Sequence, residues 1–278
     1  MSLGIKNIIQ YCGHSNFFNC IEFSMSEYHV ELEGKMDNQG GGHGRINKCI
    51  INPGNIHGIA KPVDHREFGA YQDLPQTPIF PYIPVYYGKH VLDSTEMIVI
   101  QDITAGMTSP CLADLKVGKR HWDLQASQEK IQGLIEKAAN STTTSLGVRV
   151  IDVKTRQNGK VCAQHERKAG LKFSPEEFSN VVHEFLPGKR LSEFHEQIVK
   201  IRDAFNETMK KFPGFRVYAS SILIAYDGDN ENSPLCAKLI DFAHLYIDVS
   251  SDGGDQKDPQ YDDGVIDGLN SLCSITEK

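Results

Sequence analysis

The 278-residue sequence has no excess of positive charge: 29 Lys and Arg stand against 36 Asp and Glu, a formal charge of −7. Binding to a nucleic-acid backbone needs a broad basic surface, so this composition argues against a general nucleic-acid partner. Any anionic ligand must therefore be held by a local basic cluster.

Two other features are also missing. The seven cysteines are odd in number, scattered and free of CxxC spacing, which argues against a zinc ribbon or a disulfide framework. No run approaches the roughly 18 apolar residues needed to cross a bilayer, and the N-terminus lacks a basic stretch followed by a long apolar one. A reducing cytoplasm or nucleus therefore fits best, with no membrane partner. We also expect a monomer.

The pattern of apolar residues divides the chain. Residues 1–26 show no clear period and are expected to be peripheral, and short β-prone runs predict a small antiparallel lobe over 27–103. Longer helical periods predict a larger α/β lobe over 104–278. The glycine-rich run 40–44 fits neither GxxxxGK[ST] nor GxGxxG. It is typical of a hairpin loop, although a phosphate-facing loop is left open.

Helices are predicted where apolar residues recur every three or four positions. Ser174 and Glu177 form a capping box with proline in the first turn, which marks a helix start. The helix over 127–140 is expected to bury a face containing Ile135. The predicted strands are 29–33, 46–51, 58–61, 97–100, 215–226 and 235–242, the last two forming a hairpin, and the other predicted helices are 174–185, 191–212 and 265–272.

Three residues have the chemistry of phosphoryl transfer, which needs cations for the ATP phosphates and carboxylates for magnesium. Lys61 ends a short β-run, where an ammonium could reach phosphates, although a solvated strand lysine is the common alternative. Asp241 ends an apolar strand, where a carboxylate is costly unless it binds a cation or accepts several hydrogen bonds. Ser221, on the partner strand of the hairpin, could complete a metal shell.

Positive charge concentrates between residues 116 and 137. Lys116, Lys119 and Arg120 fall within five positions, next to His121. On the helix that follows, lysines and an exposed glycine share one edge at about 100° per residue. Solvated lysines are the commoner situation, but cations that converge on one place favour a polyanion. The helix residues concerned are Lys130, Gly133 and Lys137.

With these residues in place, the sequence resembles the inositol polyphosphate kinases. Their signature PxxxDxKxG is filled by Pro110, Asp114, Lys116 and Gly118. Blocks similar to ASxEK, SSLL and IDF follow in order at 126–130, 219–223 and 240–242, and the resemblance extends over about 28–275.

The resemblance implies an α+β, two-lobed fold related to protein kinases, with ATP and Mg²⁺ as cofactors and an inositol polyphosphate as substrate. Adenine would lie at the connection between the lobes. The implied ATP-binding residues are Lys61, Gln101, Asp102, Ile103 and Asp241; those for metal are Asp241 and Ser221; those for catalysis are Asp114 and Lys116; and those for substrate are Lys116, Lys119, Arg120, Lys130, Gly133, Lys137 and Lys168.

The stretch 141–150 is similar to the inositol hexakisphosphate kinases, whereas Lys130-Ile-Gln132 is more like the multikinases. We favour a hexakisphosphate kinase that also phosphorylates lower inositol phosphates. The alternatives are a multikinase or trisphosphate kinase acting on ring hydroxyls, with Asp114 as base, and a non-catalytic scaffold. A protein kinase is disfavoured because no HRDxxxxN loop occurs.

Overall fold

The computed structural model describes residues 29–35, 46–255 and 257–277, so the predicted leader 1–26 and the glycine-rich run 40–44 lie outside the described residues. The described chain packs as two units. The first comprises the described residues up to Asp64 together with Pro84–Ala105, and the second comprises His65–Ile83 and the described residues from Gly106 onward.

Residues 65–83 therefore do not belong to the first unit, where the sequence placed them. They pack with the rest of the second unit through an aromatic contact and hydrogen bonds. Tyr71 of α1 (His65–Asp73) packs edge-on against Phe242 with ring centroids 5.7 Å apart. The Ile79 N–H donates to Thr208 Oγ1 at 3.1 Å, and Lys238 Nζ donates to the Pro81 carbonyl at 3.0 Å.

The first unit is an antiparallel sheet in the order β1-β2-β3-β5-β4. The prediction missed β4, whose pairing with β5 is irregular between Tyr86 and Gly88; the other four strands are as predicted. The core contains Val30, Cys49, Ile51, Ala60, Tyr87, Met97 and Val99. The strands are β1 (His29–Lys35), β2 (Asn47–Asn52), β3 (Ile56–Pro62), β4 (Tyr86–Leu92) and β5 (Thr95–Gln101).

The second unit contains a five-stranded sheet in the order β11-β10-β6-β7-β8, with every pair antiparallel. Alternate residues of β6 are buried on one face, while Leu112, Asp114 and Lys116 share the opposite face and are half-buried. The strands are β6 (Pro110–Val117), β7 (Val148–Gln157), β8 (Lys160–Glu166), β10 (Ser221–Asp227) and β11 (Cys236–Ile240), with a separate pair β9 (Arg216–Val217) and β12 (Leu245–Tyr246).

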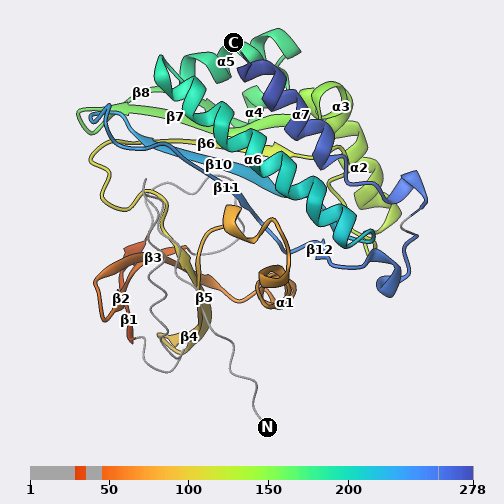
Figure 1. Cartoon of the computed structure of the whole chain (residues 1–278), viewed down its shortest axis with the longest axis horizontal. Coiled ribbons are helices and arrows are strands. Elements are labelled where there is room, and N and C mark those ends of the chain that lie inside the picture. The colour runs from red at the N-terminus through yellow and green to blue at the C-terminus, as the bar shows by residue number, and fades with distance from the viewer. Residues whose placement is uncertain (1–28, 36–45, 256, 278) are drawn as a thin grey trace. The chain divides into compact units, whose positions relative to one another are not determined.

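Helices cover the apolar face of this sheet, with α5, α6 and α7 lying along it (Figure 1). The capping box starts α5 as predicted: the Ser174 N–H donates to Glu177 Oε2 at 2.7 Å and the Glu177 N–H to Ser174 Oγ at 3.1 Å. The helices are α2 (Gln128–Ala139), α3 (Thr142–Leu146), α4 (Arg167–Gly170), α5 (Pro175–Phe185), α6 (Lys189–Lys211) and α7 (Val265–Thr276), and the 3₁₀ turns are η2 (Leu74–Gln76), η3 (Phe80–Tyr82), η4 (Val249–Asp252) and η5 (Pro259–Tyr261).

Two sequence predictions for the second unit were wrong. Helix α2 forms but buries none of its residues, and Ile135 is 42 % exposed, because α2 lies beside α3 rather than on the sheet. The predicted strand 215–226 is broken between β9 and β10, where Ala219 takes a left-handed φ of 58°. The predicted hairpin of β10 and β11 is confirmed, with Ser221 opposite Ile240.

Candidate active site

The polar face of the second sheet gathers residues from β6, β7, β10 and the end of β11. Lys116 lies opposite both Ser221 and Arg149, and Asp114 lies opposite Asp152. Asp241 follows directly on Ile240, which pairs with Ser221. Antiparallel register thus brings together carboxylates and cations that are up to 127 positions apart in the sequence, from Asp114 to Asp241.

Asp114 occupies the centre of this face. Its Oδ1 is buried without a hydrogen-bond partner. Burial, followed by the nearby Asp241 charge, raises the pKa of Asp114 to about 7, although Lys116 acts in the opposite direction. A carboxyl with such a pKa can exchange a proton near neutral pH, which suits either a general base or a metal ligand.

Lys116 is held beside the two carboxylates. Its Nζ donates to the Ala219 carbonyl at 2.7 Å. Burial lowers the pKa of Lys116, while Asp241 and Asp114 raise it. Asp241 is exposed and has a left-handed φ of 68°, as Ala219 does at 58°, and such conformations are costly for residues other than glycine. Non-glycine residues of this kind concentrate at functional sites.

Two arginines complete the cluster. Arg149, in β7, is only 3 % exposed, and its Nη1 has no hydrogen-bond partner. Burial and the neighbouring Arg167 lower the pKa of Arg149 to about 10, and Nε of Arg167 is also buried without a partner. Buried guanidinium donors without partners are costly, and an anion would satisfy them. Neither arginine was among the site residues predicted from the sequence, although an arginine between Val148 and Val150 in an apolar run was a usable signal.

His121 lies among these cations and is 9 % exposed. Burial, and then the charges of Lys116 and Arg149, lower the pKa of His121 to about 3, so its imidazole is neutral at physiological pH. It adds no charge to the cluster.

Of the predicted substrate residues on helices, Lys137 joins this cluster: burial, Arg167 and then Arg149 lower its pKa. Gly133 is exposed, with open space where a Cβ would stand. Lys130 is exposed at the start of α2 and contributes, after burial, to a lowered pKa of His244. Lys168 is exposed on α4, and it is its neighbour Arg167 that belongs to the cluster.

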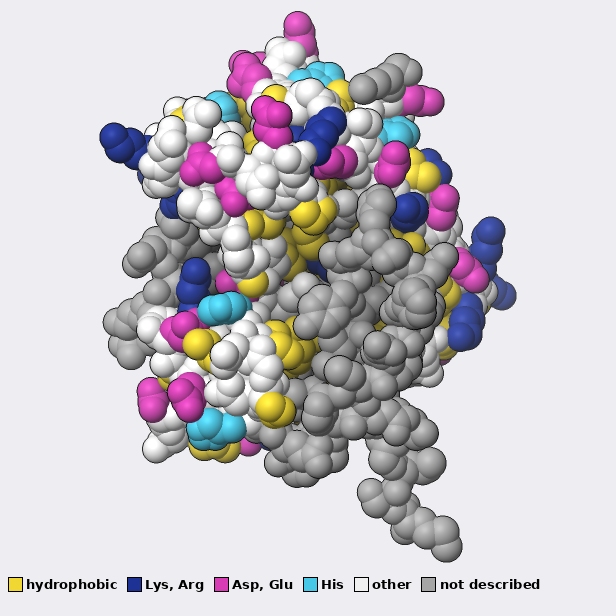
Figure 2. All heavy atoms as spheres, turned by 60° about the vertical axis from the view of Figure 1, so that its left-hand side comes forward, with side chains coloured by type: hydrophobic (Ala, Val, Ile, Leu, Met, Phe, Trp, Pro, Cys, Tyr) yellow, Lys and Arg dark blue, Asp and Glu magenta, His cyan; other side chains and the backbone are white. Residues whose placement is uncertain are grey.

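The structure does not bring Lys119 and Arg120 to the cluster. Lys119 Nζ pairs with Asp267 Oδ2 at 2.6 Å, and the Arg120 guanidinium stacks 4.8 Å from the ring centroid of Tyr218. The cause is the turn at Gly118, where φ is 98°. After it, the N–H groups of Lys119 and Arg120 both donate to the Asp263 carbonyl, at 2.9 and 3.2 Å, so the chain runs along the approach to α7. On the face that Figure 2 presents, acidic and basic side chains are interspersed.

In the first unit, Lys61 is half-buried in β3, opposite Ile98 of β5. The Gln101 N–H donates to the Val85 carbonyl at 2.8 Å. Asp102 Oδ1 accepts from both N and Oγ1 of Thr104, at 2.8 and 2.6 Å, so this oxygen caps the following turn. The ATP-binding roles of Lys61, Gln101, Asp102 and Ile103 stay predictions.

The residues present fit a hard divalent cation. Asp241 is exposed at the strand end. Asp114 Oδ1 and Ser221 Oγ are buried, and the Ser221 hydroxyl lies close enough to the Asp114 carboxylate to lower its pKa. Within the described ranges, no group of three or more His, Cys, Asp or Glu side chains could hold a metal. Mg²⁺ is commonly bound by one or two carboxylates together with substrate phosphates, which suits this donor set.

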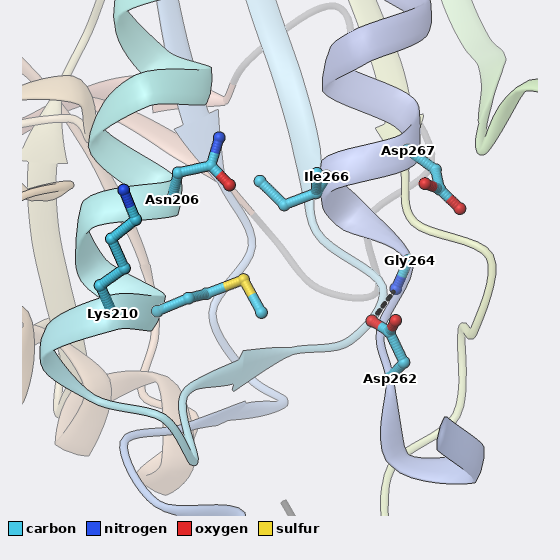
Figure 3. A pocket seen from close by; sticks show the side chains of 7 residues that line it. Asn206, Lys210, Asp262, Gly264, Ile266 and Asp267 are labelled. Carbon is cyan, nitrogen blue, oxygen red and sulfur yellow. Dashed lines mark hydrogen bonds between the residues drawn. The ribbon is translucent and has the colours of Figure 1, made fainter. Parts of the chain in front are cut away.

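A separate hollow of about 380 Å³ lies between α6 and the start of α7. Asn206, Met209 and Lys210 line one side, and Asp262 and Asp267 lie on the other with Gly264 and Ile266 (Figure 3). Two carboxylates and one cation do not suit a polyphosphate.

None of the helices in the described part of the chain has the length and apolar character to cross a membrane.

A family model described as inositol polyphosphate kinase matches residues 97–277, more than half of the chain. The chain belongs to the inositol polyphosphate kinase family. Among known proteins, it is 32 % identical to human inositol hexakisphosphate kinase 3 over 210 residues, covering 65 % of this chain and 50 % of that protein. It is 30 % identical to the mouse protein of that name, covering 64 % and 49 %. The chain thus spans about half the length of these relatives.

Members of a second group cover more of the chain. The Arabidopsis thaliana inositol polyphosphate multikinase beta is 24 % identical over 280 residues, covering 89 % of this chain and 88 % of that protein. A crystal structure of the inositol phosphate multikinase of S. cerevisiae, in complex with ADP and Mn²⁺, matches with a TM-score of 0.60 at 21 % identity, covering 79 % and 97 %. This likeness confirms the α+β two-lobed fold of the family.

Proposed function

We propose that this kinase-family chain transfers the γ-phosphoryl group of ATP to inositol hexakisphosphate, forming a diphosphoinositol polyphosphate, and also phosphorylates lower inositol phosphates. The observation that carries the proposal is one buried guanidinium donor without a partner on each of Arg149 and Arg167, beside Lys116 and the Asp114–Asp241 pair. Several cations around two carboxylates suit a polyanionic acceptor and a metal-bound phosphoryl group.

In this proposal Lys116, Arg149, Arg167 and Lys137 hold substrate phosphates, while residues of the first unit, Lys61 foremost, hold ATP. Asp241 and Ser221 hold Mg²⁺, which when bound neutralises charge on the phosphates. The chain acts as a monomer in the cytoplasm or nucleus. The yeast multikinase forms a complex with ADP and Mn²⁺, which supports the use of a nucleotide and a divalent metal in this family.

The second candidate is a multikinase that phosphorylates ring hydroxyls. It is favoured by Asp114, because a carboxyl with a pKa of about 7 can accept a hydroxyl proton near neutral pH. A phosphate acceptor needs no such base, since its oxygen is already ionised. We expect Asp114→Asn to reduce hydroxyl phosphorylation more than pyrophosphate synthesis. Equal losses with both acceptors would remove this division.

The test is to incubate the purified chain with ATP, Mg²⁺ and either inositol trisphosphate or inositol hexakisphosphate, and to resolve the products by charge. A product more highly charged than inositol hexakisphosphate supports the first proposal, and products from the trisphosphate alone support the multikinase. Asp241→Ala should abolish transfer. ATP consumption that survives this substitution would point to contaminating activity and to a non-catalytic scaffold.

A further inference from the structure

Between β9 and β10 the backbone makes a turn that contains no glycine. Ala219 has a φ of 58°, a conformation that costs about 1 kcal/mol or more for alanine. The residues beside it are fixed: the Tyr218 N–H donates to the His244 carbonyl at 3.1 Å, and the Ser220 carbonyl accepts from the Val117 N–H at 3.0 Å. The strained residue is thus held from both sides.

The turn changes the direction of one carbonyl group. In an extended strand, successive carbonyls point to opposite edges. Because the Ser220 carbonyl is bound to β6, the Ala219 carbonyl would point away from β6 if the strand continued. Instead it accepts a hydrogen bond from Lys116 Nζ at 2.7 Å.

Lys116 needs such a partner more than most lysines do. Its side chain has four rotatable carbons and ends in a compact charge. Asp114 and Asp241 attract this charge, while Arg149 and Arg167 repel it. A neutral acceptor fixes the ammonium between these opposing groups and leaves two of its three N–H donors for a ligand.

We propose that Ala219 is a positioning residue: its left-handed conformation directs its carbonyl to Lys116 Nζ and so aims the ammonium at the phosphates of the substrate. The proposal rests on the proposed function for its ligand. It assigns a role to a residue whose methyl side chain forms no hydrogen bond and carries no charge.

The test uses two substitutions at Ala219 and one control. Valine is disfavoured at positive φ because it is β-branched, whereas glycine adopts this conformation freely. Asn158→Val is the matched control, because Asn158 has a φ of 51° in the β7–β8 turn, outside the cluster. The dissociation constant of inositol hexakisphosphate for the full chain is measured by titration calorimetry with ADP and Mg²⁺ present.

We expect Ala219→Val to weaken binding about 10-fold, the usual effect of losing a hydrogen bond to a charged group. Ala219→Gly and Asn158→Val should stay within about two-fold of the wild type. In a Lys116→Met background, Ala219→Val should cause no further loss. Wild-type affinity for Ala219→Val, or the same loss with and without Lys116, would overturn the proposal.

A second measurement needs no stable valine variant. In ¹⁵N-lysine-labelled wild-type protein, the Lys116 ammonium should give a resonance protected from solvent exchange, assigned by its absence in Lys116→Met. Rapid exchange of that resonance would show that the carbonyl does not hold the ammonium. If the wild type fails to bind inositol hexakisphosphate, the proposed function falls, while this resonance still decides the contact.

Discussion

Replacing Arg149 with methionine should make the ligand-free protein more stable and its substrate binding weaker. Methionine keeps most of the side-chain volume and removes the charge. Arg149 is 3 % exposed and its Nη1 lacks a partner, so the fold bears a desolvation cost that the nearby Asp114 charge offsets only in part. Under the proposed function, a bound anion would offset this cost.

The size of the effect follows from the pKa of Arg149, which burial and the neighbouring Arg167 lower from its ordinary value to about 10. At 1.36 kcal/mol for each tenfold change in acidity, the charged form is disfavoured by about 3 kcal/mol. Allowing half of this for local relaxation, we expect the midpoint of thermal unfolding to rise by roughly 3–6 °C. Loss of one charged hydrogen bond to phosphate should weaken the binding of inositol hexakisphosphate about 10-fold or more.

The assay is a thermal melt of the metal-free protein together with calorimetric titration of inositol hexakisphosphate. Arg156→Met is the control, because it removes the same charge from the same strand and should shift stability by less than about 0.5 kcal/mol. A methionine variant that melts lower than the wild type and binds the ligand equally well would refute the reasoning. Arg149 would then be a structural residue of β7.

The other predictions concern single residues of the same unit. Arg167→Ala should weaken inositol hexakisphosphate binding about 10-fold, whereas Lys168→Ala should leave it within about two-fold. Both are measured by calorimetry, and equal losses would contradict the placement of Arg167, rather than Lys168, in the cluster. Gly118→Ala should lower the free energy of unfolding by about 1–3 kcal/mol, since φ is 98° and the new Cβ would lie 2.8 Å from the Asp263 carbonyl; an unchanged denaturation midpoint would speak against it. Asp114→Asn should stabilise the metal-free protein at pH 7.5 but not at pH 4. The raised pKa of Asp114 means that the folded state keeps a proton that the unfolded state releases between about pH 4 and 7, so wild-type stability falls as pH rises through this window. If this is wrong, thermal melts of both proteins at the two pH values would show the same difference in stability at each pH.

The parts of the fold that sequence reasoning found are those whose signal is local. The capping box at Ser174 and the apolar period after it are contained within one helix, so α5 could be predicted with its buried residues. Strand β6 was missed because its signature contains polar residues on one face, and α2 was wrongly expected to be buried because periodicity shows a stripe but not what covers it.

The candidate site is divided in the same way, between residues with a local sequence signal and residues brought together by tertiary contacts. Asp241 could be found because a carboxylate after an apolar strand is unusual in itself. Lys119 and Arg120 were grouped with Lys116 because they are close in sequence, but a left-handed glycine sends them elsewhere. Arg149 and Arg167 join Lys116 only through strand register and burial, which depend on tertiary pairing.

The contact between the signature turn and α7 has a consequence for synthesis of the protein. The Gly118 N–H donates to the Gly147 carbonyl at 2.8 Å, and Gly268 approaches that same carbonyl so closely that an added Cβ would lie 2.2 Å away. Strand β6 leaves the ribosome roughly 150 residues before this helix does. A nascent or prematurely terminated chain therefore holds Lys116 without the elements that fix the turn after it, and such fragments should be inactive whatever else in them has folded.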